Sequence, residues 1–127
     1  VEFRNKSWFE GEHLEGTLAF QRELGVVHTI VDAPQGFANV VPCVWAVTNP
    51  ALAIVRLHGR NAGSWNIKGA TSASSRFDYW YSQEELGAMV PEIRRMAGLA
   101  QHVHVLFNTN YEDQGQASAR LMRQLLG

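Results

Sequence analysis

The stretch Leu52-Ala53-Ile54-Val55-Arg56-Leu57-His58, which ends at Gly59, decides the fold of this 127-residue chain. It is rich in aliphatic and β-branched residues, and short apolar runs of this kind are typical of buried β-strands. Two other runs have the same character, Val26–Asp32 before it and His102–Phe107 after it. We therefore predict a strand in each of the three places.

Three other segments have helical patterns. Residues 13–24 carry apolar side chains at helical spacing, and the glycine that follows them suits the end of a helix. Ser82 and Glu85 form a capping box, which predicts a helix from there to about Ala100. A last helix is expected over residues 115–126. The prolines and glycines between these segments predict loops, of which residues 60–81 form the longest.

The chain opens with Val1-Glu2-Phe3-Arg4, in which apolar and polar residues alternate as they do in a half-buried strand. Strands that alternate with helices predict an α/β fold with a parallel sheet. With this fourth strand, the pattern predicts one segment, residues 1–127, that contains about four parallel strands and their flanking helices.

The composition excludes several classes of protein. The chain is 46% hydrophobic and 18% charged with a net charge of −1, so it is neither disordered nor strongly basic. The uncharged stretch 33–55 contains three prolines and several amides, which argues against a membrane span. The single cysteine, Cys43, can form no internal disulfide. We interpret it as a small buried hydrophobe in a cytoplasmic protein.

Polar residues gather where the predicted strands end. In parallel α/β folds, the ligand site is built at the carboxyl edge of the sheet, from these positions and the loops after them. The polar residues at these positions are Glu2, Arg4, Asp32, Arg56, His58, Arg60, Asn61, Asn108 and Asn110.

This set predicts binding or turnover of an anionic, phosphate-bearing ligand. His58 is the candidate general acid or base, oriented by Asp32 or Glu2, so these three form the candidate catalytic group. The same three residues have metal-ligand chemistry but no characteristic spacing. No cofactor is therefore predicted, and a divalent metal stays an alternative.

Three arginines at the same edge, Arg4, Arg56 and Arg60, suit an anion because a guanidinium contacts two oxygens at once. They also suit a non-enzymatic domain in which they pair internally with nearby carboxylates. A third interpretation is nucleic-acid binding or a nuclease-like barrel. There, the aromatic run that follows Asp78 would stack a base, although packing is the favoured role for that run.

Several ordered motifs of this chain resemble the YecE-like family, also called domain of unknown function 72. They include Val55-Arg56-Leu57-His58-Gly59-Arg60-Asn61 and Asp78-Tyr79-Trp80-Tyr81-Ser82. The residues that match the family motifs are Glu2, Arg4, Trp8, Asp32, Arg56, His58, Gly59, Arg60, Asn61, Asp78, Tyr79, Asn108 and Asn110. The resemblance adds Asp78 and Tyr79 to the candidate ligand-binding residues, and it implies no particular reaction.

The resemblance implies a TIM-barrel-like fold, of which this chain is the C-terminal half. A complete barrel of this type needs about 250 residues. Four parallel strands cannot close a barrel, and an open half would expose two sheet edges and an apolar inner face. We therefore expect either a missing N-terminal half or a second copy to complete it. The expected partners are an anionic small molecule or a nucleic acid, and no membrane.

Overall fold

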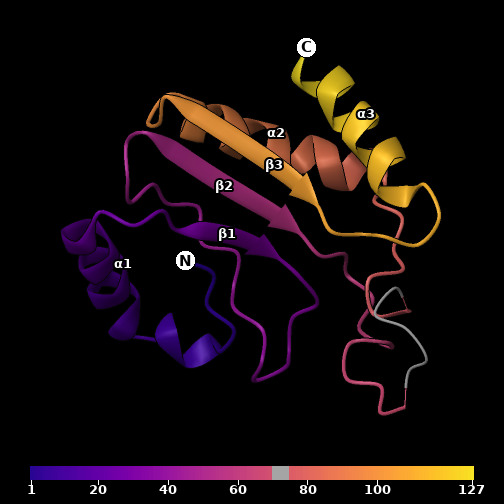
Figure 1. Ribbon diagram of the computed structural model, residues 1–127, viewed down its shortest axis with the longest axis horizontal. Coiled ribbons are helices and arrows are strands. Elements are labelled where there is room, and N and C mark those ends of the chain that lie inside the picture. Colours follow the sequence, from indigo (N-terminus) through magenta and orange to yellow (C-terminus); the bar gives the residue numbers. More distant parts are fainter. Residues whose placement is uncertain (70–74) are drawn as a thin grey trace.

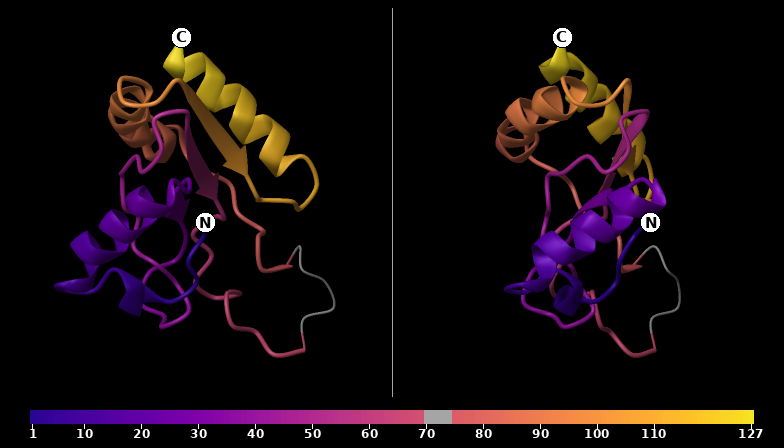
Figure 2. Two further views of the ribbon diagram at one scale, coloured as in Figure 1. Left: turned by 60° about the vertical axis from the view of Figure 1, so that its left-hand side comes forward. Right: turned by 90° about the vertical axis from the view of Figure 1, so that its left-hand side faces the viewer.

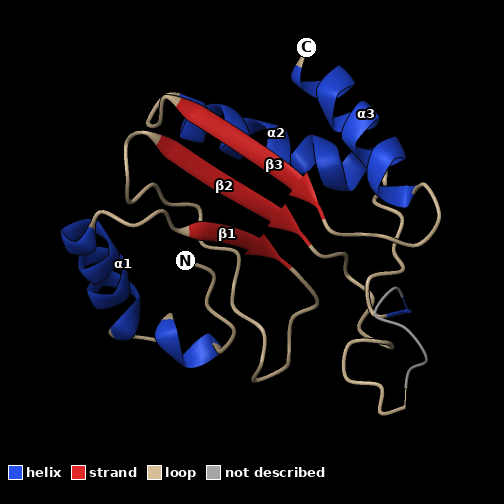
Figure 3. Ribbon diagram, in the orientation of Figure 1, coloured by secondary structure: helices blue, strands red, loops and turns tan. Residues whose placement is uncertain are grey.

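A computed structural model describes residues 1–69 and 75–127. The sequence folds into three strands and their flanking helices, with only a loop between the first two strands, coloured along the chain in Figure 1 and by type in Figure 3. The elements in chain order are η1 (Lys6–Trp8), α1 (His13–Leu24), β1 (Thr29–Asp32), β2 (Leu52–Leu57), α2 (Gln83–Ala97), β3 (His102–Phe107) and α3 (Gln114–Leu126). Part of the predicted long loop, residues 70–74, lies outside the described residues.

The three strands form one parallel sheet in the order β1-β2-β3. The register places Asp32 beside Leu57 and Leu57 beside Phe107, so all three strands end at the same edge. The arrowheads in Figure 1 show this common edge at the lower right of the sheet. The predicted α/β class with a parallel sheet and flanking helices is confirmed.

The predicted number of about four strands is wrong for the described residues, because Val1–Arg4 is not a strand there. The carbonyl of Val1 accepts a hydrogen bond from the backbone N–H of Thr29 at 2.9 Å, and its amino group donates to the carbonyl of Val27. By Lys6 the backbone N–H has turned to the carbonyl of Ala38. The segment therefore lies beside β1 without a repeating ladder. The alternation of apolar and polar residues reflects the half-burial of this segment. It does not show that the segment pairs as a strand.

The core lies on two faces because adjacent strand residues point in opposite directions. Ile30 and Val55 are buried in one cluster with Leu86 and Met96 of α2, whereas Val31 is buried in a second cluster with Leu18 of α1. Helices α2 and α3 contact each other and β3, and Figure 2 shows them together near the C-terminus.

One face of β3 is uncovered. Val103, Val105 and Phe107 pack against the first cluster, whereas His102, His104 and Leu106 between them are exposed. The apolar character expected of such an exposed face is wrong for β3, because two of the three exposed residues are histidines.

The capping box at the start of α2 gives a prediction for stability. The Ser82 hydroxyl accepts from the Glu85 N–H at 3.1 Å, and the Glu85 carboxylate accepts from the Ser82 N–H at 2.8 Å. We expect Ser82→Ala to lower the free energy of unfolding by about 1 kcal/mol in urea denaturation, because the N–H of Glu85 in the first turn loses its acceptor. Gln83→Ala, one residue away, is the control and should change stability little. Equal effects of the two substitutions would contradict the capping role.

Candidate functional site

The polar residues meet at the carboxyl edge because the backbone ladder continues past the strand ends. The N–H of His58 donates to the carbonyl of Asp32 at 2.9 Å, and the N–H of Asn108 donates to the carbonyl of Leu57 at 2.8 Å. The residues that follow β1, β2 and β3 are therefore held side by side. They form two ion-pair clusters.

The first cluster is centred on Glu2. Its Oε1 lies 2.9 Å from His58 Nε2 and 3.4 Å from Arg4 Nε, and its Oε2 bonds Arg56 Nη1. On the other side of the imidazole ring, His58 Nδ1 lies 2.9 Å from the amide nitrogen of Asn108. An amide nitrogen is a donor, so this contact suits the tautomer in which Nδ1 accepts and Nε2 donates to Glu2.

The cavity beside the His58 side chain is small. The side chain is 3% exposed, and the cavity that it lines with Glu2, Arg4 and Trp65 has a volume of about 10 Å³. That volume holds about one water molecule. Both ring nitrogens are occupied, so a substrate would have to displace a partner to reach this imidazole.

Glu2 gives a pH dependence. Burial raises the pKa of its carboxyl group, but the hydrogen bonds from His58 and Arg56 outweigh this and lower the pKa from 4.5 to about 2. A carboxyl whose pKa is depressed on folding stabilises the protein fully above the unfolded value, and this stabilisation is lost as pH falls toward the folded value. The stabilisation by the Glu2 carboxylate is therefore lost as pH falls from 4.5 to about 2.

We accordingly expect Glu2→Gln to destabilise the protein at pH 6 and to bring progressively less penalty as pH falls from 4.5 toward 2. Urea denaturation of both proteins across that range measures it. The exposed carboxylate variant Glu12→Gln is the control and should show no such convergence. A penalty for Glu2→Gln that stays constant with pH would contradict the pairing.

The second cluster is centred on Asp32, which is buried. Its Oδ1 accepts from Arg60 Nη2 at 2.9 Å, and its Oδ2 accepts from Arg60 Nε at 3.0 Å and from the Tyr81 hydroxyl at 2.7 Å. Arg60 Nη1 also lies 3.5 Å from Glu85. Asp32 therefore fixes the plane of the Arg60 guanidinium, and Glu85 flanks it.

Two tyrosines complete this cluster as hydrogen-bond donors. Burial, and then the charge of Asp32, raise the pKa of Tyr81, whose oxygen also accepts from the Gly59 N–H at 2.8 Å. Burial raises the pKa of Tyr79 to about 12, helped by its hydrogen bond of 2.6 Å to Glu85. Both phenols stay protonated at neutral pH.

A cavity of about 440 Å³ opens beside the second cluster. The Arg60 side chain is 40% exposed there, in contrast to the enclosed His58. Gln35 is fixed at its rim because its amide donates to the carbonyls of Ala33 and Val41. The lining residues are Asp32, Ala33, Pro34, Gln35, Cys43, Arg60 and Ala62.

The other predicted site residues have different positions. Asn61 donates to the carbonyl of Asp78 at 3.0 Å, and the Asp78 carboxylate accepts from Gln114 at 2.7 Å. These contacts anchor the loop after β2 to the start of α3. Asn110 is exposed and joins neither cluster within the described part of the chain.

Sequence reasoning missed several members of the site. Tyr81 was one of three aromatic residues with no distinguishing signal, and Glu85 was assigned only its capping role. Cys43 is half-buried and lines the Arg60 cavity, although burial raises the pKa of its thiol to about 12. Nothing in the sequence indicated that Gln114 would contact Asp78 and Tyr79.

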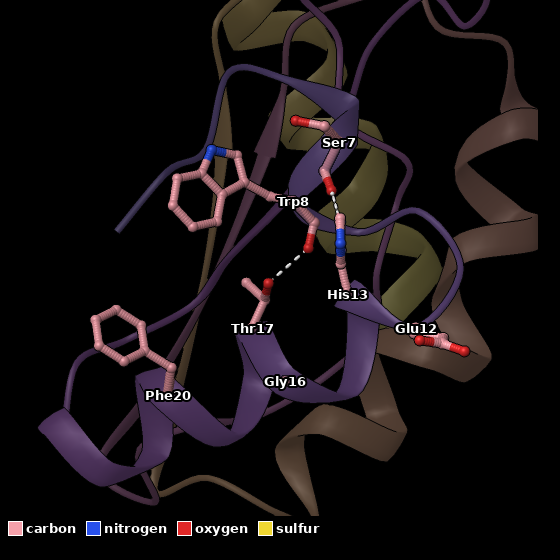
Figure 4. Close-up of a pocket in the computed structure, with 7 residues that line it drawn as sticks. All are labelled: Ser7, Trp8, Glu12, His13, Gly16, Thr17 and Phe20. Carbon is pink, nitrogen blue, oxygen red and sulfur yellow. Dashed lines mark hydrogen bonds between the residues drawn. The ribbon is translucent and has the colours of Figure 1, made fainter.

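A separate cavity of about 520 Å³ lies between η1 and α1 (Figure 4). Two of its polar side chains are hydrogen-bonded to nearby backbone. The Thr17 hydroxyl donates to the carbonyl of Trp8 at 2.6 Å, and His13 Nδ1 lies 2.8 Å from the carbonyl of Ser7. This cavity therefore lacks the converging charged groups found at the strand ends.

Among residues 1–69 and 75–127, no group of three or more His, Cys, Asp or Glu side chains is arranged to hold a metal ion. None of the helices described is long and apolar enough to cross a membrane.

Comparison with known proteins gives one consistent result. The chain matches the family described as "Protein of unknown function DUF72" over residues 1–127. It is 34% identical to UPF0759 protein YunF of Bacillus subtilis strain 168, across 99% of this chain and 45% of that protein. The chain therefore spans about half the length of the curated relative that it matches.

Solved structures of DUF72 family proteins are also similar to this chain. A DUF72 family protein of Enterococcus faecalis V583 is similar with a TM-score of 0.90 and 34% identity, over 99% of this chain and 46% of that one. A DUF72 family protein of Thermotoga maritima MSB8 is similar with a TM-score of 0.85 and 30% identity, over 99% and 45% of the two chains.

Proposed function

This chain belongs to the DUF72 family, and we propose that its cavity at the strand ends binds a small phosphate-bearing or carboxylate anion through Arg60. The observation that carries the proposal is the fixed guanidinium. Asp32 holds one edge of it through Nε and Nη2, while the side chain remains 40% exposed in a cavity of about 440 Å³. Pre-oriented guanidinium N–H groups are well suited to oxyanions.

The other two arginines do not line this cavity. Arg56 is occupied by Glu2, and Arg4 is largely exposed with one contact of 3.4 Å to the same carboxylate. Arg4 is therefore free to turn toward a ligand, whereas Arg56 holds Glu2. A catalytic role for His58, Glu2 and Asp32 is a further proposal. It requires a substrate that displaces Asn108 or Glu2 from the imidazole.

A titration followed by NMR tests the proposal, with inorganic phosphate as the probe. We expect saturable shifts around Arg60 in the wild type and at least a tenfold loss of affinity in Arg60→Gln. The exposed arginine Arg120 on α3 provides the matched control, and Arg120→Gln should bind as the wild type does. Unchanged affinity in Arg60→Gln would overturn the proposal.

The same titration with short single- and double-stranded DNA and RNA separates the nucleic-acid alternative. Phosphate contacts to a nucleic acid weaken steeply with salt. Tight, salt-sensitive binding that depends on Arg60 would favour a nucleic-acid ligand over a small anion.

A second candidate function is structural, and the pairing of the arginines favours it. Arg56 and Arg60 are both bonded to carboxylates within the molecule, as an internal ion-pair network requires. In that case Arg60→Gln would lower stability, and no anion would bind the wild type. Parallel denaturation and titration of one variant therefore distinguish the two functions.

We further propose that the sheet is part of a TIM-barrel-like fold. The parallel order of the strands, the helices on one face of β3 and the exposed face of His102, His104 and Leu106 all support it. The region that makes the relatives longer would cover this face, and a second copy is the alternative. Sizing chromatography with light scattering tests that alternative, since a stable monomer would exclude the second copy.

A further inference from the structure

A fourth cavity lies at the opposite end of the sheet from Arg60. Its volume is about 470 Å³, within the range of small-molecule sites. Arg22 comes from the last turn of α1, Arg95 from the last turn of α2, and the loop before β2 supplies the remaining wall. The lining residues are Arg22, Trp45, Ala46, Val47, Thr48, Asn49, Pro50, Arg95 and Leu99.

The charge of this cavity differs from that of the strand-end cavity. Two arginines line it, and the carboxylate that pairs with one of them, Glu92 beside Arg95, is not among the lining residues, whereas the strand-end cavity is lined by one arginine and the aspartate that pairs with it. Arg22 has no ion pair among the residues whose structure is described. Favourable interaction with a helix C-terminus explains each arginine alone. It does not explain why both line one cavity.

The geometry of Arg95 is set in advance. Its Nε and Nη2 donate to Glu92 at 2.9 and 2.6 Å, and Nη2 also donates to the carbonyl of Trp45 at 3.3 Å. Its side chain is nevertheless 52% exposed, and Nη1 makes no hydrogen bond to any described residue. The hydrogen bond to the Trp45 carbonyl holds the Arg95 guanidinium to the residue whose indole ring helps to line the cavity.

The loop wall is also pre-formed. The Thr48 hydroxyl donates to the carbonyl of Val26 at 2.6 Å and accepts from the His28 N–H at 2.8 Å. The Asn49 amide donates to the carbonyl of Gly25 at 2.7 Å. Because these polar groups are satisfied within the protein, recognition falls to the guanidiniums and the half-buried Trp45.

We propose that this cavity binds a small anion that carries an aromatic ring, the chemical class that includes mononucleotides. The two guanidiniums would contact the phosphate or carboxylate, and the Trp45 indole would stack on the ring. The site shares no residue with the Arg60 cavity. Binding at this site can therefore be tested independently of the function proposed above.

Calorimetric titration with adenosine 5′-monophosphate tests the site. We expect saturable binding to the wild type and a loss of about tenfold in affinity for Arg22→Gln and for Arg95→Gln, since a charge-assisted hydrogen bond is worth that much. Arg120→Gln is the control and should leave this affinity unchanged. Because the strand-end cavity is itself proposed to take a phosphate-bearing anion, Arg60→Gln removes that contribution, and saturable nucleotide binding that depends on Arg22 and Arg95 should persist in it. Complete loss of saturable nucleotide binding in Arg60→Gln would place the nucleotide at the strand-end site and overturn the proposal.

Two further probes test the role of the ring. Ribose 5-phosphate and adenosine should each bind more weakly than the full nucleotide. Trp45→Leu should weaken the nucleotide more than ribose 5-phosphate, and Trp45→Phe, which keeps a ring and the fold, should restore most of the difference. Absence of saturable nucleotide binding, or equal affinity for nucleotide and ribose 5-phosphate, would overturn the proposal.

Discussion

Replacing Gly59 with alanine is expected to lower the free energy of unfolding by about 4 kcal/mol, because it combines backbone strain with overpacking. Gly59 has a φ of +86°, in the left-handed region. A Cβ at this position would lie 2.6 Å from Tyr79 Cβ and 3.2 Å from Thr109 Cγ2. Neither neighbour can move freely, because Tyr79 is bonded to Gln114 and Glu85, and Thr109 is buried.

Gly25→Ala separates the two causes. Gly25 ends α1 with a φ of +67°, but nothing lies within 4 Å of the position that its Cβ would take. Its alanine variant should therefore lose only about 1 kcal/mol, the cost of the left-handed backbone. Denaturation in urea measures both variants. Similar losses for the two would contradict the close approach at Gly59.

The second large effect is expected for Asp32→Ala, with a loss of about 4 kcal/mol. Removing one member of a buried ion pair leaves its partners unsatisfied. Here the substitution deprives Arg60 of two hydrogen bonds and deprives the Tyr81 hydroxyl of its acceptor. The loss should exceed that of Arg60→Gln, because the arginine is 40% exposed and its replacement leaves Asp32 with the Tyr81 bond.

Asp32→Asn keeps an acceptor for Tyr81 and removes the charge. We expect it to retain the fold with a smaller loss of stability and to bind phosphate more weakly than the wild type, since the guanidinium is no longer fixed. A double-mutant cycle with Arg60→Gln measures the coupling between the two side chains. Additive losses would show that Asp32 does not hold Arg60.

The strongest local signals in the sequence predicted the helices and strands well. The apolar run of β3 and the capping box of α2 were correct because burial and caps are local properties of the chain. Val1–Arg4 was predicted wrongly as a strand. Its half-burial comes from packing of Phe3 in the second cluster, which produces the same alternation as a paired strand.

The candidate site was predictable as a region but not in its pairings. That Asp32 and His58 would share one edge follows from the strand ends, and the register places Asp32 beside the last residue of β2. Glu2 reaches the same edge from a segment that is not a strand. The division into two clusters depends on loop paths. Nothing in the spacing indicated that Arg56 would bond Glu2 while Arg60 would bond Asp32. Tyr81 and Glu85 join the site from a loop and a helix end, over distances in sequence that local patterns do not encode.

The most direct test of the account is a crystal structure of the protein soaked with sulfate or phosphate. We predict an oxyanion in the cavity of Asp32, Gln35, Cys43 and Arg60, with its oxygens within hydrogen-bond distance of the Arg60 guanidinium, and the same cavity empty in Arg60→Gln. Oxyanions found only elsewhere on the molecule, with none at Arg60 in the wild type, would contradict the central claim.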